Sequence, residues 1–378
     1  MKNIVAIIVL VLFANTSFSQ DKGSENVVGI NHVINSSILK ENRQIQVYLP
    51  KDYKTSNKKY PVIYLLDGQR FFLYGASLIQ TFSELKLTPD FIVVGITQTN
   101  RRKDVSMEGK KMANFLKNDV VKLIDSTYRT LNKRLLFGWE WAGGSGIETL
   151  IAKSNLFDGY ILSSPFPVSS KMKRFKSFIE ENKNLNTFVY FVSDAKEFGV
   201  KEGTEELSDF LNKNTTNLRW TFKVLSGEEH ESTAYPALYH GIKEYFENFN
   251  EVRFSDLQEF NLKGGLNFVN TYYTKRSNLY GFTKELEPYT KYHIISLAIR
   301  AKDYKQFHFL VTNFNTETLI SQFYVNWLCN IADFYIKSQK KKEAFTFYKL
   351  ISEKFPTSKR AQKAIEILKL DATKLLEK

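Results

Sequence analysis

One segment combines the residue types and spacing of a catalytic turn. Arg134 to Phe137 is typical of a buried strand, and Gly138 to Gly144 leads into a helix start rich in small residues. Gly138 and Ala142 stand two residues before and two residues after Glu140, where a very tight turn needs small side chains. The pattern predicts a nucleophile elbow, a turn whose apex side chain projects above a sheet, with Glu140 at the apex.

A carboxylate at this apex changes the chemistry. Serine hydrolases use an alcohol that a neighbouring imidazole deprotonates. The carboxylate of Glu140 needs no such activation, but it is a weak nucleophile toward an ester carbonyl and would place negative charge beside the developing oxyanion. Inverting the sign of that electrostatic interaction should cost several kcal/mol, or about a thousandfold in rate. We therefore expect little or no serine-type ester hydrolysis.

Other groups do not replace the missing alcohol easily. Ser145 falls inside the helix that follows the turn, and Ser163 and Ser164 belong to another strand end. None can reach the apex without breaking the strand register. A covalent carboxylate nucleophile acting on alkyl halides suits aspartate, which is one methylene shorter than Glu140.

The elements that must position this turn alternate between short apolar runs and helical stretches. Arg43 to Leu49 alternates as an edge strand does, and the other strand-like runs are more continuously apolar. These runs are Pro61 to Leu66, Phe91 to Ile96, Arg134 to Phe137, Tyr160 to Ser163, Thr187 to Val192 and Arg219 to Leu225; the helical stretches are Met112 to Tyr128, Gly146 to Lys153 and Tyr235 to Phe249. We predict an α/β architecture, a mostly parallel sheet with covering helices, over residues 28–250.

Strand signals end near residue 250, and the pattern from residue 290 to 378 is helical. Between them, residues 251–289 are expected to form a linker or helical connection. Asn326 to Pro356 fits the tetratricopeptide helix pair, whose period is about 34 residues. The matching positions are Leu328, Ile331, Ala332, Tyr335, Ala344, Tyr348, Ile351 and Pro356. Tyr292 to Gln322 is at best a degenerate repeat, and we expect an all-α, TPR-like region.

Composition narrows the class of protein. The chain has 53 basic and 40 acidic residues, a net charge of +13, but its lysines are scattered and no nucleic-acid motif is present. A single cysteine, Cys329, excludes an intrachain disulfide. We find no phosphate loop, dinucleotide fingerprint or zinc-ligand spacing, and expect no metal, cofactor, nucleic acid or membrane span.

The N-terminus has the pattern of a cleavable signal peptide. Lys2 precedes the apolar stretch Ile4 to Ala14, and Ser17-Phe18-Ser19 supplies small residues before a cut at Gln20. We expect residues 1–19 to be removed and the protein to be periplasmic or secreted.

Residues 28–250 resemble the putative esterase family of α/β-hydrolases, which includes siderophore and feruloyl esterases. The resemblance rests on motifs spread along that region, in addition to the turn at Glu140. They are Val47 to Pro50, Tyr60 to Gly68, Phe157 to Tyr160 and Glu229 to Ser232. The family's Gly-His-Ser-x-Gly-Gly corresponds to Gly138 through Gly143, so Glu140 stands where the family has its nucleophilic serine. The resemblance implies an α/β-hydrolase fold.

The resemblance also assigns roles to other residues. His230 corresponds to the general base, and the acid that orients it would be Asp194, preferred, or Glu197. Backbone N–H groups of Trp141 and of Gly68 or Gln69 would form the oxyanion hole. Trp139 and Trp141 flank the apex and could stack on a ligand, although tryptophans more often fill cores. If Glu140 and His230 face each other, we expect an ion pair between them.

Three functions follow as hypotheses. The first is an exported esterase-family protein with a degenerate nucleophile, which binds an ester-bearing or acylated molecule, or a partner protein, with little or no hydrolysis. The second is an active carboxylic-ester hydrolase with a non-standard Glu140, His230 and Asp194 site. The third is a scaffold in an envelope complex that binds a protein partner through its TPR-like tail.

Overall fold

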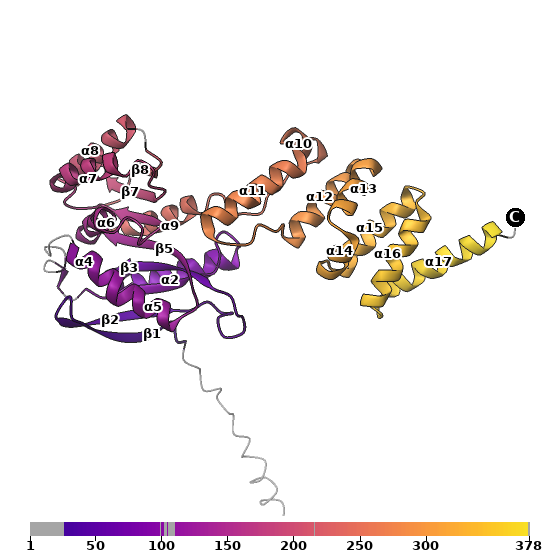
Figure 1. Ribbon diagram of the computed structural model, residues 1–378, viewed down its shortest axis with the longest axis horizontal. Helices are drawn as coiled ribbons and strands as arrows, with labels where there is room; N and C mark the ends of the chain where they lie inside the picture. The colour runs from indigo at the N-terminus through magenta and orange to yellow at the C-terminus, as the bar shows by residue number, and fades with distance from the viewer. Residues whose placement is uncertain (1–25, 99, 102–103, 105–109, 215, 377–378) are drawn as a thin grey trace, which may run out of the picture.

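The computed structural model describes residues 26–98, 100–101, 104, 110–214 and 216–376. The chain forms an α/β part followed by an extended all-helical part (Figure 1). The predicted signal peptide, residues 1–19, lies outside the described residues. Within them, no helix combines the length and apolar character that crossing a bilayer requires.

One mixed sheet forms the centre of the α/β part. Its strands follow the order β1-β2-β4-β3-β5-β6-β7-β8. Their bounds are β1 Ile30–Ser36, β2 Glu41–Tyr48, β3 Tyr60–Leu66, β4 Ile92–Ile96, β5 Thr130–Trp139, β6 Gly159–Ser163, β7 Phe188–Asp194 and β8 Arg219–Leu225. β2 is antiparallel to both neighbours, and the pairs from β4 to β8 are parallel. A mostly parallel sheet was the prediction from the sequence.

The prediction of the edge strand was wrong. The run from Arg43 to Leu49 lies within β2, which is covered on its outer side by β1. Of the seven residues of β1 only Ser36 is buried, so β1 lacks the apolar run by which most of the other strands were recognised.

Helices cover both faces of the sheet. On β3, Val62, Tyr64 and Leu66 face one core, while Ile63 and Leu65 face the other. Helices α2 (Gly68–Glu84) and α9 (Ala234–Tyr245) pack on the second face. The first face is covered by α4 (Lys110–Phe115), the π-helix Leu116–Val121, α5 (Lys122–Thr127), α6 (Trp141–Ala152), α7 (Met172–Glu181) and α8 (Lys201–Lys213).

The helical part has a hydrophobic core of its own. It contains α10 (Leu257–Leu262), α11 (Gly265–Tyr280), α12 (Pro288–Ala301), α13 (Tyr304–Asn313), α14 (Thr316–Gln322), α15 (Val325–Lys337), α16 (Lys341–Lys354) and α17 (Lys359–Leu376). The expected connection over residues 251–289 is therefore helical, and residues such as Phe260 and Tyr273 belong to this core.

The predicted helix pair is α15 with α16. All seven of its apolar positions before Pro356 are buried. The region expected as a degenerate repeat, Tyr292 to Gln322, differs from a simple pair because it spans three helices, α12, α13 and α14.

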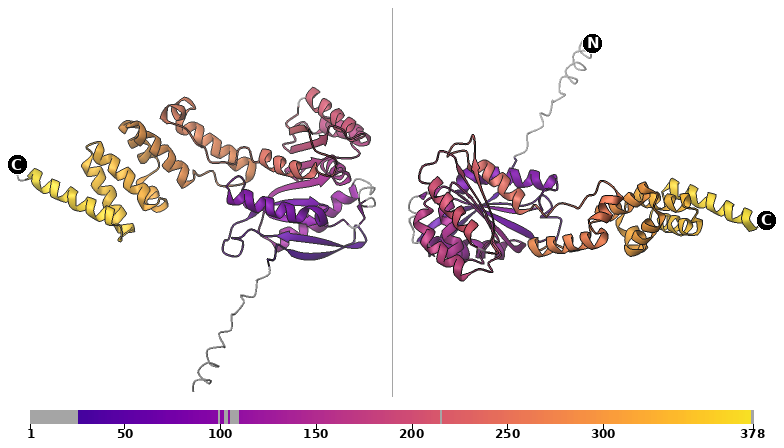
Figure 2. Two further views of the ribbon diagram at one scale, coloured as in Figure 1. Left: turned by 180° about the vertical axis from the view of Figure 1, so that it is seen from behind. Right: turned by 90° about the horizontal axis from the view of Figure 1, so that it is seen from above.

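The two parts meet at the C-terminal end of α11. Tyr280 packs against Tyr245 and Phe246 of the α/β part, and its hydroxyl donates a 2.7 Å hydrogen bond to the carbonyl of Tyr245. Beyond this junction, α12 to α17 extend away from the sheet (Figure 2). The site predicted at Glu140 must therefore be built from the α/β part.

Candidate functional site

The chain makes a sharp turn at Glu140, as predicted. Glu140 has φ 57° and ψ −120°, between the last residue of β5 and the first residue of α6. Its N–H donates to the carbonyl of Ser163, and its own carbonyl accepts from the N–H groups of Gly144 and Phe166. A Cβ at Gly138 would lie 2.5 Å from the carbonyl oxygen of Ala142, so the turn needs glycine there.

The candidate side chains gather at one edge of the sheet. Asp67 follows β3, Glu140 follows β5, Glu197 follows β7 and His230 follows β8. Since these strands are parallel, their carboxyl ends meet at the same edge, the usual place for sites in open α/β sheets.

His230 is oriented by Glu197. The ring Nδ1 of His230 lies 2.5 Å from Oε1 of Glu197, and because a carboxylate only accepts, Nδ1–H is the donor. The other oxygen of Glu197 accepts from the N–H of Asp194 at 2.7 Å and from the hydroxyl of Ser164 at 2.9 Å. Glu197 is thus buried, and both of its carboxylate oxygens accept hydrogen bonds.

The preference for Asp194 as the acid partner of His230 is corrected by this geometry. Asp194 is the last residue of β7 and pairs in register with Leu225, so its backbone is held in the sheet. Glu197 comes three residues later, in the loop, and its longer side chain reaches back to the imidazole.

Arg101 is the main partner of Glu140, and sequence reasoning missed it. Its Nη1 donates to Oε2 of Glu140 at 2.8 Å, while its Nε lies 2.9 and 3.0 Å from the two carboxylate oxygens of Asp67. The expected pair between Glu140 and His230 is longer, 3.7 Å from Oε1 to Nε2, which is within ion-pair reach but beyond a hydrogen bond.

Asp67 anchors this network from inside the protein. It is fully buried, at the left-handed backbone position that precedes α2. Burial raises the pKa of its carboxyl group, and the positive charge of Arg101 offsets only part of that rise. Arg101 therefore joins a buried acid to the half-buried tip of the turn, and holds the carboxylate of Glu140 in place.

Trp139 supports the loop of His230 and offers little surface to a ligand. It is 7% exposed, its Nε1–H donates to the carbonyl of His230 at 3.0 Å, and the guanidinium groups of Arg101 and Arg70 lie 4.8 and 5.3 Å from its ring centre. Trp141 is half-buried and packs edge-on against Phe166. The expected ligand-stacking role thus fits Trp141 better than Trp139.

The expected oxyanion donors occupy suitable positions. Trp141 begins α6, and Gly68 and Gln69 begin α2, so their N–H groups are in first helical turns and have no acceptor within their own helix. Gly68 packs so closely that an added Cβ would lie 2.5 Å from the carbonyl carbon of Gly95. The side-chain oxygen of Gln69 accepts from the N–H of Gln98 at 3.0 Å.

The neighbouring serines Ser163 and Ser164 are buried and form hydrogen bonds inside the protein. Ser163 donates to the hydroxyl of Thr233 and Ser164 donates to Glu197, each at 2.9 Å, and both serines are fully buried. Ser145 is buried in α6. Among the described residues, no group of three or more histidine, cysteine, aspartate and glutamate side chains is arranged to hold a metal ion.

A family model and several solved structures match this chain. The family described as "Putative esterase" matches residues 36–233, which include the turn at Glu140 as well as Glu197 and His230. No curated protein sequence is significantly similar to the chain.

The solved structures show the same fold. An IroE-like serine hydrolase from Shewanella oneidensis has a TM-score of 0.60 at 23% identity, over 75% of this chain and 97% of its own. An uncharacterised protein from Capnocytophaga ochracea has a TM-score of 0.72 at 15% identity, over 90% of this chain and 99% of its own. The siderophore hydrolase EstB from Aspergillus nidulans has a TM-score of 0.54 at 18% identity, over 62% of this chain and 100% of its own.

Proposed function

Because this chain belongs to the Putative esterase family, we propose that it is an exported member that binds an ester-bearing or acylated molecule and hydrolyses it little or not at all. The observation that carries the proposal is the carboxylate of Glu140 at the tip of the turn, ion-paired with Arg101 at 2.8 Å. An anion stands where ester hydrolysis requires an alcohol.

The contacts of Glu140 oppose a nucleophilic role. An ion pair with a guanidinium draws electron density from the carboxylate and fixes its position, so attack on a carbonyl would have to break that pair first. Glu140 directly precedes Trp141, whose N–H would stabilise an oxyanion, and a carboxylate close to a developing oxyanion would repel it. This arrangement suits ligand binding. The carboxylate of Glu140 can accept a hydrogen bond from a hydroxyl or amide of the ligand, while the N–H groups bind the carbonyl of the ligand.

A second contact supports the proposal that other parts of an esterase site are retained. His230 and Glu197 form the pair expected of a general base and the acid that orients it. Restoring an alcohol at position 140 should therefore restore some activity. We also propose a TPR-like character for the helical part, which the burial of the predicted helix-pair positions supports.

The test uses short-chain nitrophenyl esters and compares the chain without residues 1–19 with four variants, which are Glu140→Ala, Glu140→Ser, His230→Ala and Glu140→Ser/His230→Ala. The native protein and Glu140→Ala should show no turnover above buffer, while Glu140→Ser should gain turnover that is lost again in Glu140→Ser/His230→Ala. Binding of phenyl acetate, followed by tryptophan fluorescence because Trp139 and Trp141 flank residue 140, should occur in the native protein.

Turnover by the native protein that disappears in His230→Ala would contradict the proposal and favour the second hypothesis, an active hydrolase. Absence of both turnover and ligand binding in the native protein would also count against it.

A further inference from the structure

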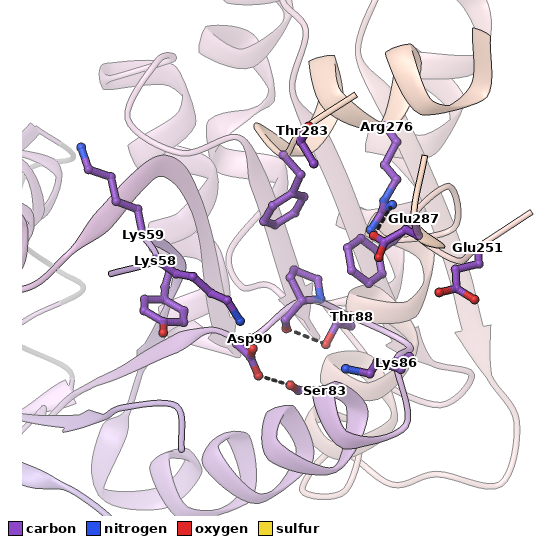
Figure 3. Close-up of a pocket in the computed structure, with 14 residues that line it drawn as sticks. Lys58, Lys59, Ser83, Lys86, Thr88, Asp90, Glu251, Arg276, Thr283 and Glu287 are labelled. Atoms are coloured by element: carbon purple, nitrogen blue, oxygen red, sulfur yellow. Dashed lines mark hydrogen bonds and ion pairs between the residues drawn. The ribbon is translucent and has the colours of Figure 1, made fainter. Parts of the chain in front are cut away.

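A cavity lies where the helical part joins the α/β part (Figure 3). Its volume is about 310 Å³, room for about ten water molecules or a ligand with about ten non-hydrogen atoms. One wall comes from the start of β3 and the C-terminal end of α2, and the other from α11 and the loops beside it. None of the candidate-site residues lines it.

The wall formed by the helical part is acidic. Glu251 and Glu287 line it, together with the buried Arg276, whose Nη1 lies 3.1 Å from Oε1 of Glu287. Burial raises the pKa of Glu251, and the charge of Glu287 raises it further. Arg253 lies 4.0 Å from Glu251, and the charges of Arg253, Arg276 and Lys86 lower the pKa of Glu251, but its net shift is still upward. A further cationic group in the cavity would therefore lower the electrostatic energy of the carboxylates.

The wall formed by the α/β part is mainly basic. Lys58, Lys59 and Lys86 line it, and Asp90 stands among them as the acceptor of a hydrogen bond from Ser83. The ammonium of Lys58 is already paired with Asp52, at 2.8 Å. Among the residues that the structure describes, no carboxylate lies within ion-pair distance of the ammonium of Lys86.

The backbone fixes the position of Lys86. This residue has φ 61°, a left-handed conformation that favours glycine at the end of a helix. The turn is closed by hydrogen bonds from the N–H of Lys86 to the carbonyl of Ser83 and from the N–H of Leu87 to the carbonyl of Phe82, at 3.0 and 2.8 Å. Lys86 thus places a long cationic side chain at a position where glycine would adopt the same backbone conformation at lower energy.

We propose that this cavity binds a small zwitterion, a free α-amino acid or a dipeptide, with its ammonium against Glu251 and Glu287 and its carboxylate against Lys86. A purely cationic or purely anionic ligand would be attracted by one wall of the cavity and repelled by the other. The available volume matches a molecule of amino-acid to dipeptide size.

The first experiment measures ligand binding by the native chain. The standard L-α-amino acids and L-alanyl-L-alanine are screened by thermal shift at about 10 mM, and the strongest ligand is then titrated by calorimetry. Its N-acetylated and C-amidated forms should each bind at least about tenfold more weakly, because each loses one charge-assisted hydrogen bond. Absence of any stabilisation, or equal binding of the three forms, would overturn the proposal.

The second experiment uses a variant that is expected to fold. Lys86→Gly removes the ammonium and relieves the left-handed backbone, so binding should fall at least about tenfold while thermal stability is kept or raised. Lys40→Gly is the matched control, because Lys40 has φ 58° and does not line the cavity. Undiminished binding by Lys86→Gly would also overturn the proposal, whatever the outcome at Glu140.

Discussion

Replacing Arg101 by methionine should weaken the α/β part markedly. Asp67 is fully buried and receives its two shortest side-chain contacts from Arg101, so the variant leaves a buried carboxylate without its cation. Such a change costs about 3–5 kcal/mol in the free energy of unfolding, and we expect about 3 because the side chain of Arg101 is itself 21% exposed. Loss of the ion pair with Glu140, whose side chain is 23% exposed, adds about 0–1 kcal/mol to this destabilisation.

The loss should depend on pH. Burial raises the pKa of Asp67 above its ordinary value of 3.8, and without Arg101 that pKa rises further. A group whose pKa is raised in the folded state destabilises the protein when it is ionised, so the penalty is present above the folded pKa and disappears below the unfolded value. The difference between native and variant should therefore be largest near neutral pH and shrink toward about pH 4.

Thermal unfolding followed by circular dichroism measures both effects. A loss of about 3 kcal/mol corresponds to a decrease in Tm of about 6–12 °C for a domain of this size. Arg174→Met is the matched control, because the side chain of Arg174 is 49% exposed and its pair with Glu148 should contribute at most about 1 kcal/mol. If Arg101→Met unfolds like the control near neutral pH, the network around Asp67 does not stabilise the fold as argued.

Two further changes test the turn and the acid partner. Gly138→Ala places a Cβ 2.5 Å from the carbonyl oxygen of Ala142. Urea titrations should therefore show a free energy of unfolding that is lower by about 1–3 kcal/mol. An unchanged midpoint of the urea transition would mean that the turn can relax. In the Glu140→Ser background, Glu197→Gln should reduce ester turnover by up to about 10⁴-fold, because the carboxylate that orients the imidazole is lost. Asp194→Asn in the same background should retain most of the turnover. A larger loss in Asp194→Asn than in Glu197→Gln would restore Asp194 as the partner of His230.

Strands with an apolar run or an alternating pattern were predictable, and β1, which has no apolar run, was not. β3, β4, β6 and β7 are buried along their whole length, and the hydrophobic pattern that buries them is local in the sequence. β1 is exposed over much of its length and is ordered by pairing with β2, so its formation depends on a neighbour that the local pattern does not reveal.

The candidate site shows the same division. Glu140 was found because a tight turn restricts the residues on either side of it, and His230 because a family motif surrounds it. Arg101 has no such local constraint, since its role arises only when the segment after β4 lies beside the ends of β3 and β5. The choice between Asp194 and Glu197 likewise depends on side-chain reach from a loop, which sequence spacing leaves open.

The backbone at residue 140 does not depend on the side chain it carries. Three main-chain hydrogen bonds hold the turn, and they involve only the peptide groups of Glu140, Ser163, Gly144 and Phe166. A conformation of this kind costs about 1–3 kcal/mol, which the surrounding fold must offset whichever residue is present. An alcohol, a thiol or a carboxylate would each be presented at the same point above the sheet. One substitution at residue 140 would therefore change the chemical group that the turn presents, with the architecture unchanged.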